Sequence, residues 1–208
     1  MEPLCPPWNQ PESADKQRYI VEGLAAVQTF IDKKAPTLVL QHGHLKDWHK
    51  RLFDKVVPIS YYAGNYRQID VSRPCLQKPI QVGDRQGAPF AEVPNRMQQF
   101  SQRIEELVRQ TDKFLSVVRL PSDNAKAVMQ LAAVLSGQFI QIHPFLNGNG
   151  RVSRLIVNYV SARYGHGPLY TSSDNRPKNP DYASAGKACM DGNFVPLYQY
   201  LVTAFGSR

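Results

Sequence analysis

One segment of the chain reads His143-Pro144-Phe145-Leu146-Asn147-Gly148-Asn149-Gly150-Arg151-Val152-Ser153-Arg154. After its glycines, apolar residues recur at the spacing of one helix face: Val152, Leu155, Ile156, Tyr159 and Val160. The small residues Gly148, Asn149 and Gly150 therefore predict a tight loop that opens a helix.

A loop of this kind is a common anion site. It exposes backbone N–H groups, and the helix dipole adds partial positive charge there. Arg151 and Arg154 are three residues apart and share a face of the helix. Cations are disfavoured at this end of a helix unless an anion accompanies them, and two guanidinium groups suit a polyphosphate. A Gly-rich turn or a lone histidine is by itself typical of ordinary structure; their combination with the two arginines favours a phosphate site beside His143.

The segment resembles the signature of the Fic family, His-x-Phe-x-Asp/Glu-Gly-Asn-Gly-Arg-x-x-Arg, at every fixed position except Asn147. Members of this family typically transfer the AMP part of ATP to a hydroxyl of a target protein. The resemblance implies a mainly α Fic-type helical bundle with a small β-hairpin flap. It also implies His143 as the general base and ATP as the substrate, and it implies phosphate contacts from Gly148, Asn149, Gly150, Arg151 and Arg154. The ordinary pKa of histidine, about 6.5, suits proton transfer near neutral pH.

Asn147 stands where the family usually has an acidic residue that helps to bind Mg²⁺. Its side chain offers one neutral carbonyl oxygen, a poorer ligand for a hard cation than a carboxylate. The phosphate oxygens of ATP could still hold Mg²⁺. The sequence leaves three alternatives: a slower AMP transferase, an enzyme with another donor, or a nucleotide-binding protein without activity.

A helix is expected from about Ser13 to just before Pro36, because Ser13 or Asp15 can cap it and Ile20, Leu24, Val27 and Ile31 form a stripe. Within it, Glu22-Gly23 resembles the end of the family's inhibitory pattern, Ser/Thr-x-x-x-Glu-Gly/Asn, although Arg18 occupies the first position. The resemblance implies that Glu22 pairs with Arg154. The alternative is that Arg18, four residues earlier, holds Glu22 on the helix surface. We therefore divide the chain into residues 1–36, a proline-rich lead-in that Trp8 is expected to dock followed by an inhibitory helix, and residues 37–208, the Fic core.

The segment 58–93 is punctuated by proline and glycine, and two short alternating stretches, 66–71 and 79–82, predict a β-hairpin. Residues 63–67 resemble the opening of the family's flap, Gly-x-Tyr/Phe-Arg, which receives the target as an added strand. The resemblance implies that Gly64, Tyr66, Arg67 and Ile69 dock the target protein.

Further helices are predicted over 37–53, from Pro94, from Ser122 to the signature, over 180–190 and from Pro196. His49, in the first of these, is interpreted as a structural hydrogen-bonding residue. Tyr182 lies in a region that, in relatives, borders the adenine pocket, and the resemblance implies that it does so here; a buried core tyrosine is the alternative.

The composition bounds the remaining possibilities. The chain has 208 residues, 42% hydrophobic and 20% charged, as expected for one folded domain without a membrane span. Its start lacks the pattern of a signal peptide, and Cys5, Cys75 and Cys189 show neither a disulfide framework nor metal spacing. These features favour the cytoplasm, with export by a route that uses no signal peptide as the alternative.

The net charge is +8, yet the basic residues are scattered, which argues against a nucleic-acid surface. The expected partner is a target protein with a hydroxyl side chain, with self-modification as a further case. The competing interpretation is a non-enzymatic basic module that binds an acidic partner.

Overall fold

The structure is a computed structural model that describes residues 5–8, 13–117, 120–171 and 177–206. Within these ranges the chain forms seven α-helices, two short 3₁₀ helices and one two-stranded hairpin. In chain order they are α1 (Ala14–Lys34), α2 (His42–Phe53), η1 (Ser60–Tyr62), η2 (Pro74–Leu76), β1 (Gln81–Val82), β2 (Arg85–Gln86), α3 (Val93–Leu115), α4 (Pro121–Ile142), α5 (Asn149–Arg163), α6 (Pro180–Met190) and α7 (Val195–Gly206). The expected mainly α bundle with a small hairpin is confirmed.

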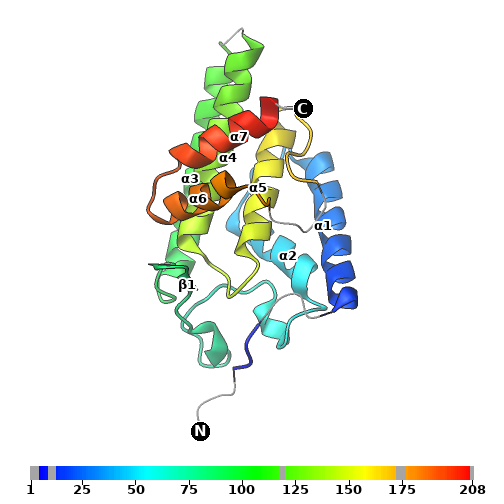
Figure 1. Ribbon diagram of the computed structural model, residues 1–208, viewed down its shortest axis with the longest axis vertical. Coiled ribbons are helices and arrows are strands. Elements are labelled where there is room, and N and C mark those ends of the chain that lie inside the picture. The colour runs from blue at the N-terminus through cyan, green and yellow to red at the C-terminus, as the bar shows by residue number, and fades with distance from the viewer. Residues whose placement is uncertain (1–4, 9–12, 118–119, 172–176, 207–208) are drawn as a thin grey trace.

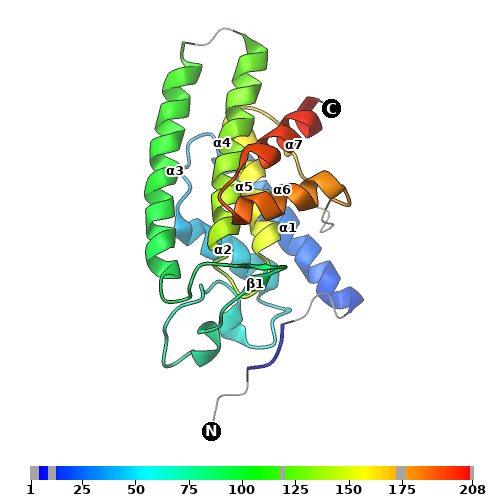
Figure 2. The same cartoon turned by 60° about the vertical axis from the view of Figure 1, so that its left-hand side comes forward.

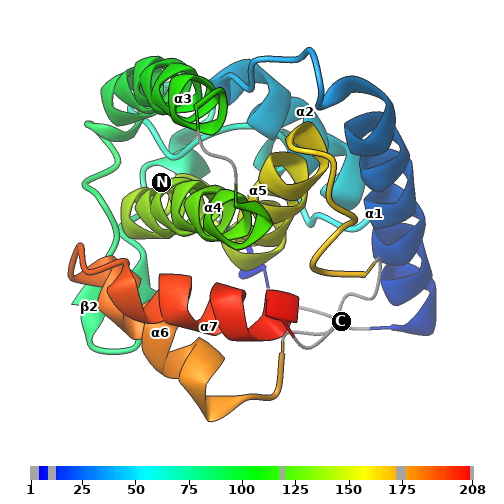
Figure 3. The same ribbon diagram turned by 90° about the horizontal axis from the view of Figure 1, so that it is seen from above.

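The centre of the bundle is the pair α4 and α5, which pack against each other and carry the signature segment between them. Seen from above, α3, α2 and α1 surround this pair on one side, and α6 and α7 cover the other (Figure 3). The sequence explains this placement, because α5 is buried continuously from Val152 to Ser161 and so must be covered on every side. The α4–α5 loop therefore starts from two helices fixed by the core.

The helix pair α3 and α4 runs antiparallel and extends beyond the rest of the bundle (Figure 2). At its opposite end, α4 stops at the signature loop, on the same side of the bundle as the hairpin and the segment that follows α2 (Figure 1). The signature loop, the hairpin and the segment that follows α2 therefore all lie at this end of the bundle.

Helix α1 has the predicted limits. Ser13 is its N-cap and accepts from the backbone N–H of Lys16 at 3.3 Å, and Ala35, just before Pro36, ends it. Its apolar stripe joins the same core as α4 and α5. Gly23 permits this packing: a Cβ there would lie 2.6 Å from the Arg51 carbonyl oxygen of α2.

Helix α2 begins at His42 rather than at Thr37, and polar contacts explain the delay. The backbone of residues 38–40 is engaged by Tyr159, whose hydroxyl donates to the Leu38 carbonyl at 2.6 Å and accepts from Leu40 N–H at 3.2 Å. Gln41 then caps the helix together with His44. A helix through residues 38–40 would give up this anchor to α5.

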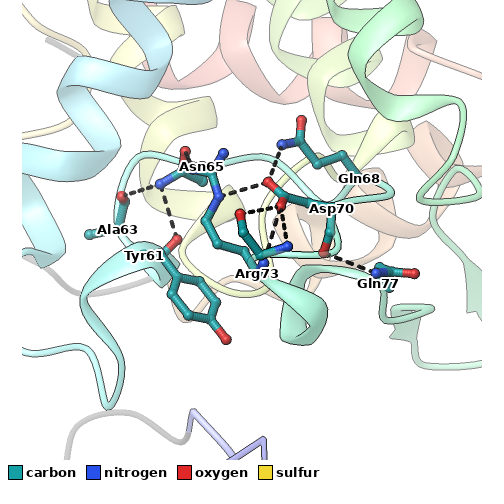
Figure 4. A network of polar contacts seen from close by, with 8 residues as sticks. Tyr61, Ala63, Asn65, Gln68, Asp70, Arg73 and Gln77 are labelled. Atoms are coloured by element: carbon teal, nitrogen blue, oxygen red, sulfur yellow. Dashed lines mark hydrogen bonds and ion pairs between the residues drawn. The ribbon is translucent and has the colours of Figure 1, made fainter. Parts of the chain in front are cut away.

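The prediction of a hairpin from residues 66–71 and 79–82 is wrong in its first strand. The observed hairpin pairs Gln81 with Gln86 and Val82 with Arg85 across the two-residue turn Gly83-Asp84. Asp70 explains the difference, because its carboxylate accepts from Ser72 N–H and Arg73 N–H and turns the chain out of a strand (Figure 4). Side-chain hydrogen bonds, first from the Ser72 hydroxyl and then from Arg73 and Gln68, lower the pKa of Asp70 to about 2.

The interpretation of the cysteines is also wrong. Cys5 and Cys75 form a disulfide, with Cα atoms 5.4 Å apart and a separation of 70 in sequence. The sequence carried no signal of this pairing because the two residues meet only through the fold. The bond removes one basis for expecting a reducing compartment.

In the described part of the chain, helices long and apolar enough to cross a bilayer are absent.

Candidate active site

The signature loop is closed by Asn149, the first residue of α5. Its side chain accepts from Phe145 N–H at 3.0 Å and donates to the Phe145 carbonyl at 2.9 Å, and it is buried. Asn149 was expected to contact phosphate, and the structure commits its side-chain amide to the loop. Gly148, at φ +79°, leads directly into the helix, and its carbonyl accepts from the N–H groups of Arg151 and Val152, so the N–H groups of Asn149 and Gly150 precede the first bonds of the helix.

His143 caps the C-terminal end of α4 in the left-handed conformation, with φ +52°. Among the described residues it is the only non-glycine residue with positive φ, a conformation that costs about 1–2 kcal/mol. Its Nδ1 lies 3.2 Å from the Ile140 carbonyl oxygen, which can only accept, so Nδ1 carries the proton. In the neutral ring, Nε2 is then the basic nitrogen.

The ring of His143 is neutral at physiological pH. Burial lowers its pKa to about 4, with a smaller contribution from the charge of Arg67, while the bond to Ile140 acts in the opposite direction. A neutral, oriented imidazole can accept a proton at pH 7.

His49 supports the loop from behind, as the sequence predicted for a structural residue. Its ring stacks on Phe145 at 3.7 Å between centroids, accepts from Gly64 N–H at Nδ1 and donates from Nε2 to the Asn147 carbonyl. Burial lowers its pKa to about 3. It is therefore a neutral spacer that ties α2 to the loop.

Asn147 is occupied by bonds within the protein. Its Oδ1 accepts from Gly148 N–H at 2.6 Å, and its Nδ2 donates to the Trp8 carbonyl at 2.8 Å. Among the described residues there is no cluster of three His, Cys, Asp or Glu side chains that would hold a metal. The residues present therefore do not fit a Mg²⁺ ion held by the protein at this position.

The segment Cys5–Trp8, here called the strap, lies against this side of the site. It is held by the disulfide to Cys75, and its Cys5 and Pro6 carbonyls accept from Lys78 and Tyr62. The Trp8 ring packs against Tyr62, Phe53 and His49, which confirms the expected docking of Trp8.

The two arginines differ in environment. Arg154 is 9% exposed and lines a small crevice with Arg151, and it also lines a larger cavity. The Arg151 guanidinium lies 5.7 Å from the Phe53 ring centroid. The predicted shared face is therefore present, with Arg154 as the more deeply placed of the two.

A cavity of about 220 Å³ brings four of the predicted residues together, whereas Gly148, Asn149 and Arg151 are not part of its lining. His143, Gly150, Arg154 and Tyr182 all line it, and so do Ser153 of α5 and Val82 of the hairpin. Tyr182 is half-buried and contacts Tyr170 and Tyr200, so an aromatic cluster forms one side. Cys189 also lines the cavity, and burial raises the pKa of its thiol to about 12, which makes it a poor nucleophile.

Glu22 does not lie where the inhibitory interpretation needs it. Its side chain is 58% exposed and lies 3.8 Å from Arg18 Nε, and it lines neither cavity that Arg154 lines. The residues of α1 that reach the arginines are Leu24 and Gln28. The predicted pairing of Glu22 with Arg154 is wrong in this structure, and the surface pair with Arg18 is the observed arrangement.

The residues predicted to dock a target separate into two kinds. Tyr66 and Arg67 are buried, and Gly64 is committed to His49, so these three support the loop from inside. Tyr66 packs on Phe145 and donates to the His42 carbonyl. Only Ile69 is open to a partner, at 66% exposed.

Sequence reasoning missed Gly87 and the strap. A Cβ on Gly87 would lie 2.9 Å from His143 Cβ and 3.1 Å from Arg67 Nη2, so a glycine is required where the hairpin passes His143. Pro-Gly punctuation marked the segment as irregular but carried no signal of this contact. The strap had no signal beyond Trp8 in a proline-rich stretch.

Comparison with known proteins gives a consistent result. A model of the Fic/DOC family matches residues 39–161. Protein adenylyltransferase Fic of Aedes aegypti is 32% identical over 73 residues, which are 35% of this chain and 14% of that protein; the same protein of Drosophila erecta is 33% identical over 70 residues. The chain therefore spans about a seventh of the length of these curated relatives.

Solved structures share the fold. A Fic domain containing signaling protein from Bacteroides thetaiotaomicron has a TM-score of 0.66 at 19% identity, covering 94% of this chain and 71% of that one. The BepC protein of Bartonella tribocorum, solved with bound AMPPNP, has a TM-score of 0.60 at 15% identity, covering 91% and 86%.

Proposed function

Because the chain belongs to the Fic/DOC family, we propose that it is a protein adenylyltransferase, which transfers AMP from ATP to a Ser, Thr or Tyr hydroxyl of a target protein. The observation that carries the proposal is the cavity whose wall includes His143, Gly150 and Arg154 together. Relatives named adenylyltransferases and a similar fold with bound AMPPNP support the same reaction class and nucleotide.

In the proposed reaction the target hydroxyl oxygen attacks the α-phosphorus of ATP. A new P–O bond forms to the target, the bond between the α-phosphorus and the bridging oxygen breaks, and pyrophosphate leaves. His143 accepts the hydroxyl proton at Nε2, since Nδ1 is held by the Ile140 carbonyl. Proton removal matters because a neutral hydroxyl is a weak nucleophile.

The remaining residues act by position and charge. The N–H groups at the start of α5 and the helix dipole favour the α-phosphate, and Arg151 and Arg154 favour the β- and γ-phosphates. Tyr182 would contact the adenine. We propose the target to lie along the hairpin, whose Val82 lines the cavity, with Ile69 as an outlying contact.

The test is incubation of the protein with ATP labelled at the α- or the γ-phosphate, with and without added target extract. Label from the α-phosphate alone on protein means AMP transfer, label from the γ-phosphate alone means phosphorylation, and label from neither supports the binding-module alternative. Transfer of another nucleotide donor tested in parallel would indicate the second alternative.

His143→Ala is the decisive variant, because it removes the base and leaves the phosphate loop. We expect transfer to fall at least about 100-fold, as is typical when a general base is lost, while ATP binding stays within a few-fold. His166→Ala is the matched control: His166 packs on Phe205 and is absent from the cavity lining. Wild-type turnover in His143→Ala would refute the mechanism.

A further inference from the structure

Arg67 is a fully buried cation that contacts the backbone behind His143. Its side chain is 0% exposed. The guanidinium donates twice to the His143 carbonyl oxygen, from Nε at 2.9 Å and from Nη2 at 2.8 Å. It also donates to the carbonyls of Ala88 at 2.8 Å, Ile142 at 3.2 Å and Lys78 at 3.3 Å.

This arrangement differs from an ordinary buried ion pair. Among the described residues Arg67 makes no ion pair with a carboxylate, so its charge is balanced by carbonyl dipoles. Two of these carbonyls belong to the C-terminal end of α4, where a helix carries partial negative charge. A buried charge is costly, so a site that keeps one without a counter-ion needs the directional bonds that a guanidinium makes.

The bonds of Arg67 fix the residue whose backbone is strained. His143 has a left-handed φ, and its carbonyl direction follows from that conformation. The backbone N–H of Arg67 donates to the next carbonyl, that of Pro144, at 2.8 Å. Arg67 thus binds the carbonyls of Ile142, His143 and Pro144, on both sides of the turn from which the His143 ring lines the cavity.

We propose that Arg67 is a positioning residue for the transfer reaction: by binding the His143 carbonyl it holds residue 143 in the left-handed conformation that directs its ring into the cavity. The expected effect of Arg67 on the transfer rate rests on the proposed function, whereas its effect on the conformation of His143 does not. It also replaces the target-docking role that the family resemblance implied for Arg67.

The chain that follows the hairpin belongs to the same hydrogen-bond network. Ala88 accepts from Arg67, and its N–H donates to the Ile142 carbonyl at 3.1 Å. Arg67 therefore joins the end of α4 to the chain that leaves β2, so the base and the proposed docking edge keep a fixed relation.

The test compares Arg67→Lys with Arg163→Lys. Lysine keeps the charge at position 67 but cannot make the fork of bonds to four carbonyls. Arg163 is a matched control: its side chain is 12% exposed and donates to the carbonyls of Ala35, Pro36 and Leu38, at the far end of α5. Arg163 differs in that it also pairs with Asp112 at 3.1 Å. Both changes remove a guanidinium that donates to several carbonyls, but only the change at position 67 removes bonds to His143.

We expect Arg67→Lys to lower kcat at least tenfold with KM for ATP changed less than threefold. The backbone and ring NMR shifts of His143, which report its φ and its surroundings, should move. Arg163→Lys should lower the melting temperature while leaving kcat and the His143 signals unchanged. If Arg67→Lys does not fold, Arg67→Gln, which removes the buried charge as well, is measured in the same way.

Unchanged His143 shifts in the Arg67 variants would overturn the proposal, as would a kcat loss no larger than that of Arg163→Lys. If the wild-type protein transfers no AMP at all, the proposed function fails, yet the NMR comparison still decides whether Arg67 positions His143.

Discussion

Gly87 lies where the chain leaves the hairpin and passes over His143. The distances that a Cβ would have there, 2.9 Å to His143 Cβ and 3.1 Å to Arg67 Nη2, leave no room for a methyl group. The atoms in the way are rigid, because one is attached to the backbone of a strained residue and the other belongs to a fully bonded guanidinium.

We therefore expect Gly87→Ala to destabilise the protein by about 1–3 kcal/mol through overpacking and to reduce transfer by displacing His143. Urea unfolding and the labelled-ATP assay measure the two effects. Gly43→Ala is the control, since Gly43 lies in α2 with no atom near its Cβ position, and alanine there should gain about 0.5–1 kcal/mol of helix propensity. Equal stability of Gly87→Ala and wild type would contradict the close contact.

For Glu22 we predict that substitution leaves the transfer rate unchanged. It is exposed and paired with Arg18 at 3.8 Å, and an i,i+4 surface pair contributes about 0.3–0.5 kcal/mol.

Glu22→Ala should therefore leave the transfer rate at low and saturating ATP unchanged and alter stability by less than about 1 kcal/mol. Arg18→Ala should behave alike. A clear rise in transfer for Glu22→Ala, but not for Arg18→Ala, would instead restore the inhibitory role.

At the scale of elements, the strap is tied to the site by a covalent bond and by Asn147. The disulfide closes a loop between residues 70 apart in sequence. In the chain-entropy account, a loop of this length is worth about 4 kcal/mol to the folded state.

We expect dithiothreitol to lower the urea midpoint of the wild-type protein. Cys5→Ser is the control. It lacks the disulfide, so its urea midpoint should already be at the lower value and should not change with the reductant. Cys189 is buried in both proteins and does not distinguish them. A reductant effect of the same size in Cys5→Ser would mean that the disulfide is not its source.

Elements were predictable from the sequence where local signals agree with the core. Ser13 and Pro36 delimit α1, and the apolar repeat after Gly150 is α5. The errors have long-range causes: Tyr159 delays α2, Asp70 redirects residues 66–71, and Cys5 meets Cys75. In the site, residue types were predictable, whereas the face occupied by Glu22 and the burial of Arg67 depend on packing that no spacing rule contains.

For the molecule as a whole, two histidines couple stability to pH: His49, which is buried, and His143, which is half-buried at the cavity wall. Burial holds the pKa of His49 near 3 and that of His143 near 4, against about 6.5 in an unfolded chain. Between pH 6.5 and 4 the unfolded state therefore binds more protons than the folded state. The free energy of unfolding must fall as the pH falls through that range.

Between pH 7 and 4.5, His143 alone should cost on the order of 2–3 kcal/mol of unfolding free energy. Urea unfolding of wild type and His143→Ala at both pH values isolates this contribution, because the other titrating groups are common to the two proteins. The loss on acidification should be smaller in the variant; parallel losses would contradict a depressed pKa.

The Trp8–Asn147 contact also has a consequence for the order of folding. It joins residues 139 apart in sequence, and the bonds of Arg67 to the His143 carbonyl span 76 residues, whereas α3 and α4 are neighbours along the chain. Loop closure costs entropy before a distant contact repays it, so high contact order slows assembly. We expect the helical scaffold to form first and the site to close last, and amides of the signature loop to exchange with solvent through partial openings that leave the α4–α5 pair protected.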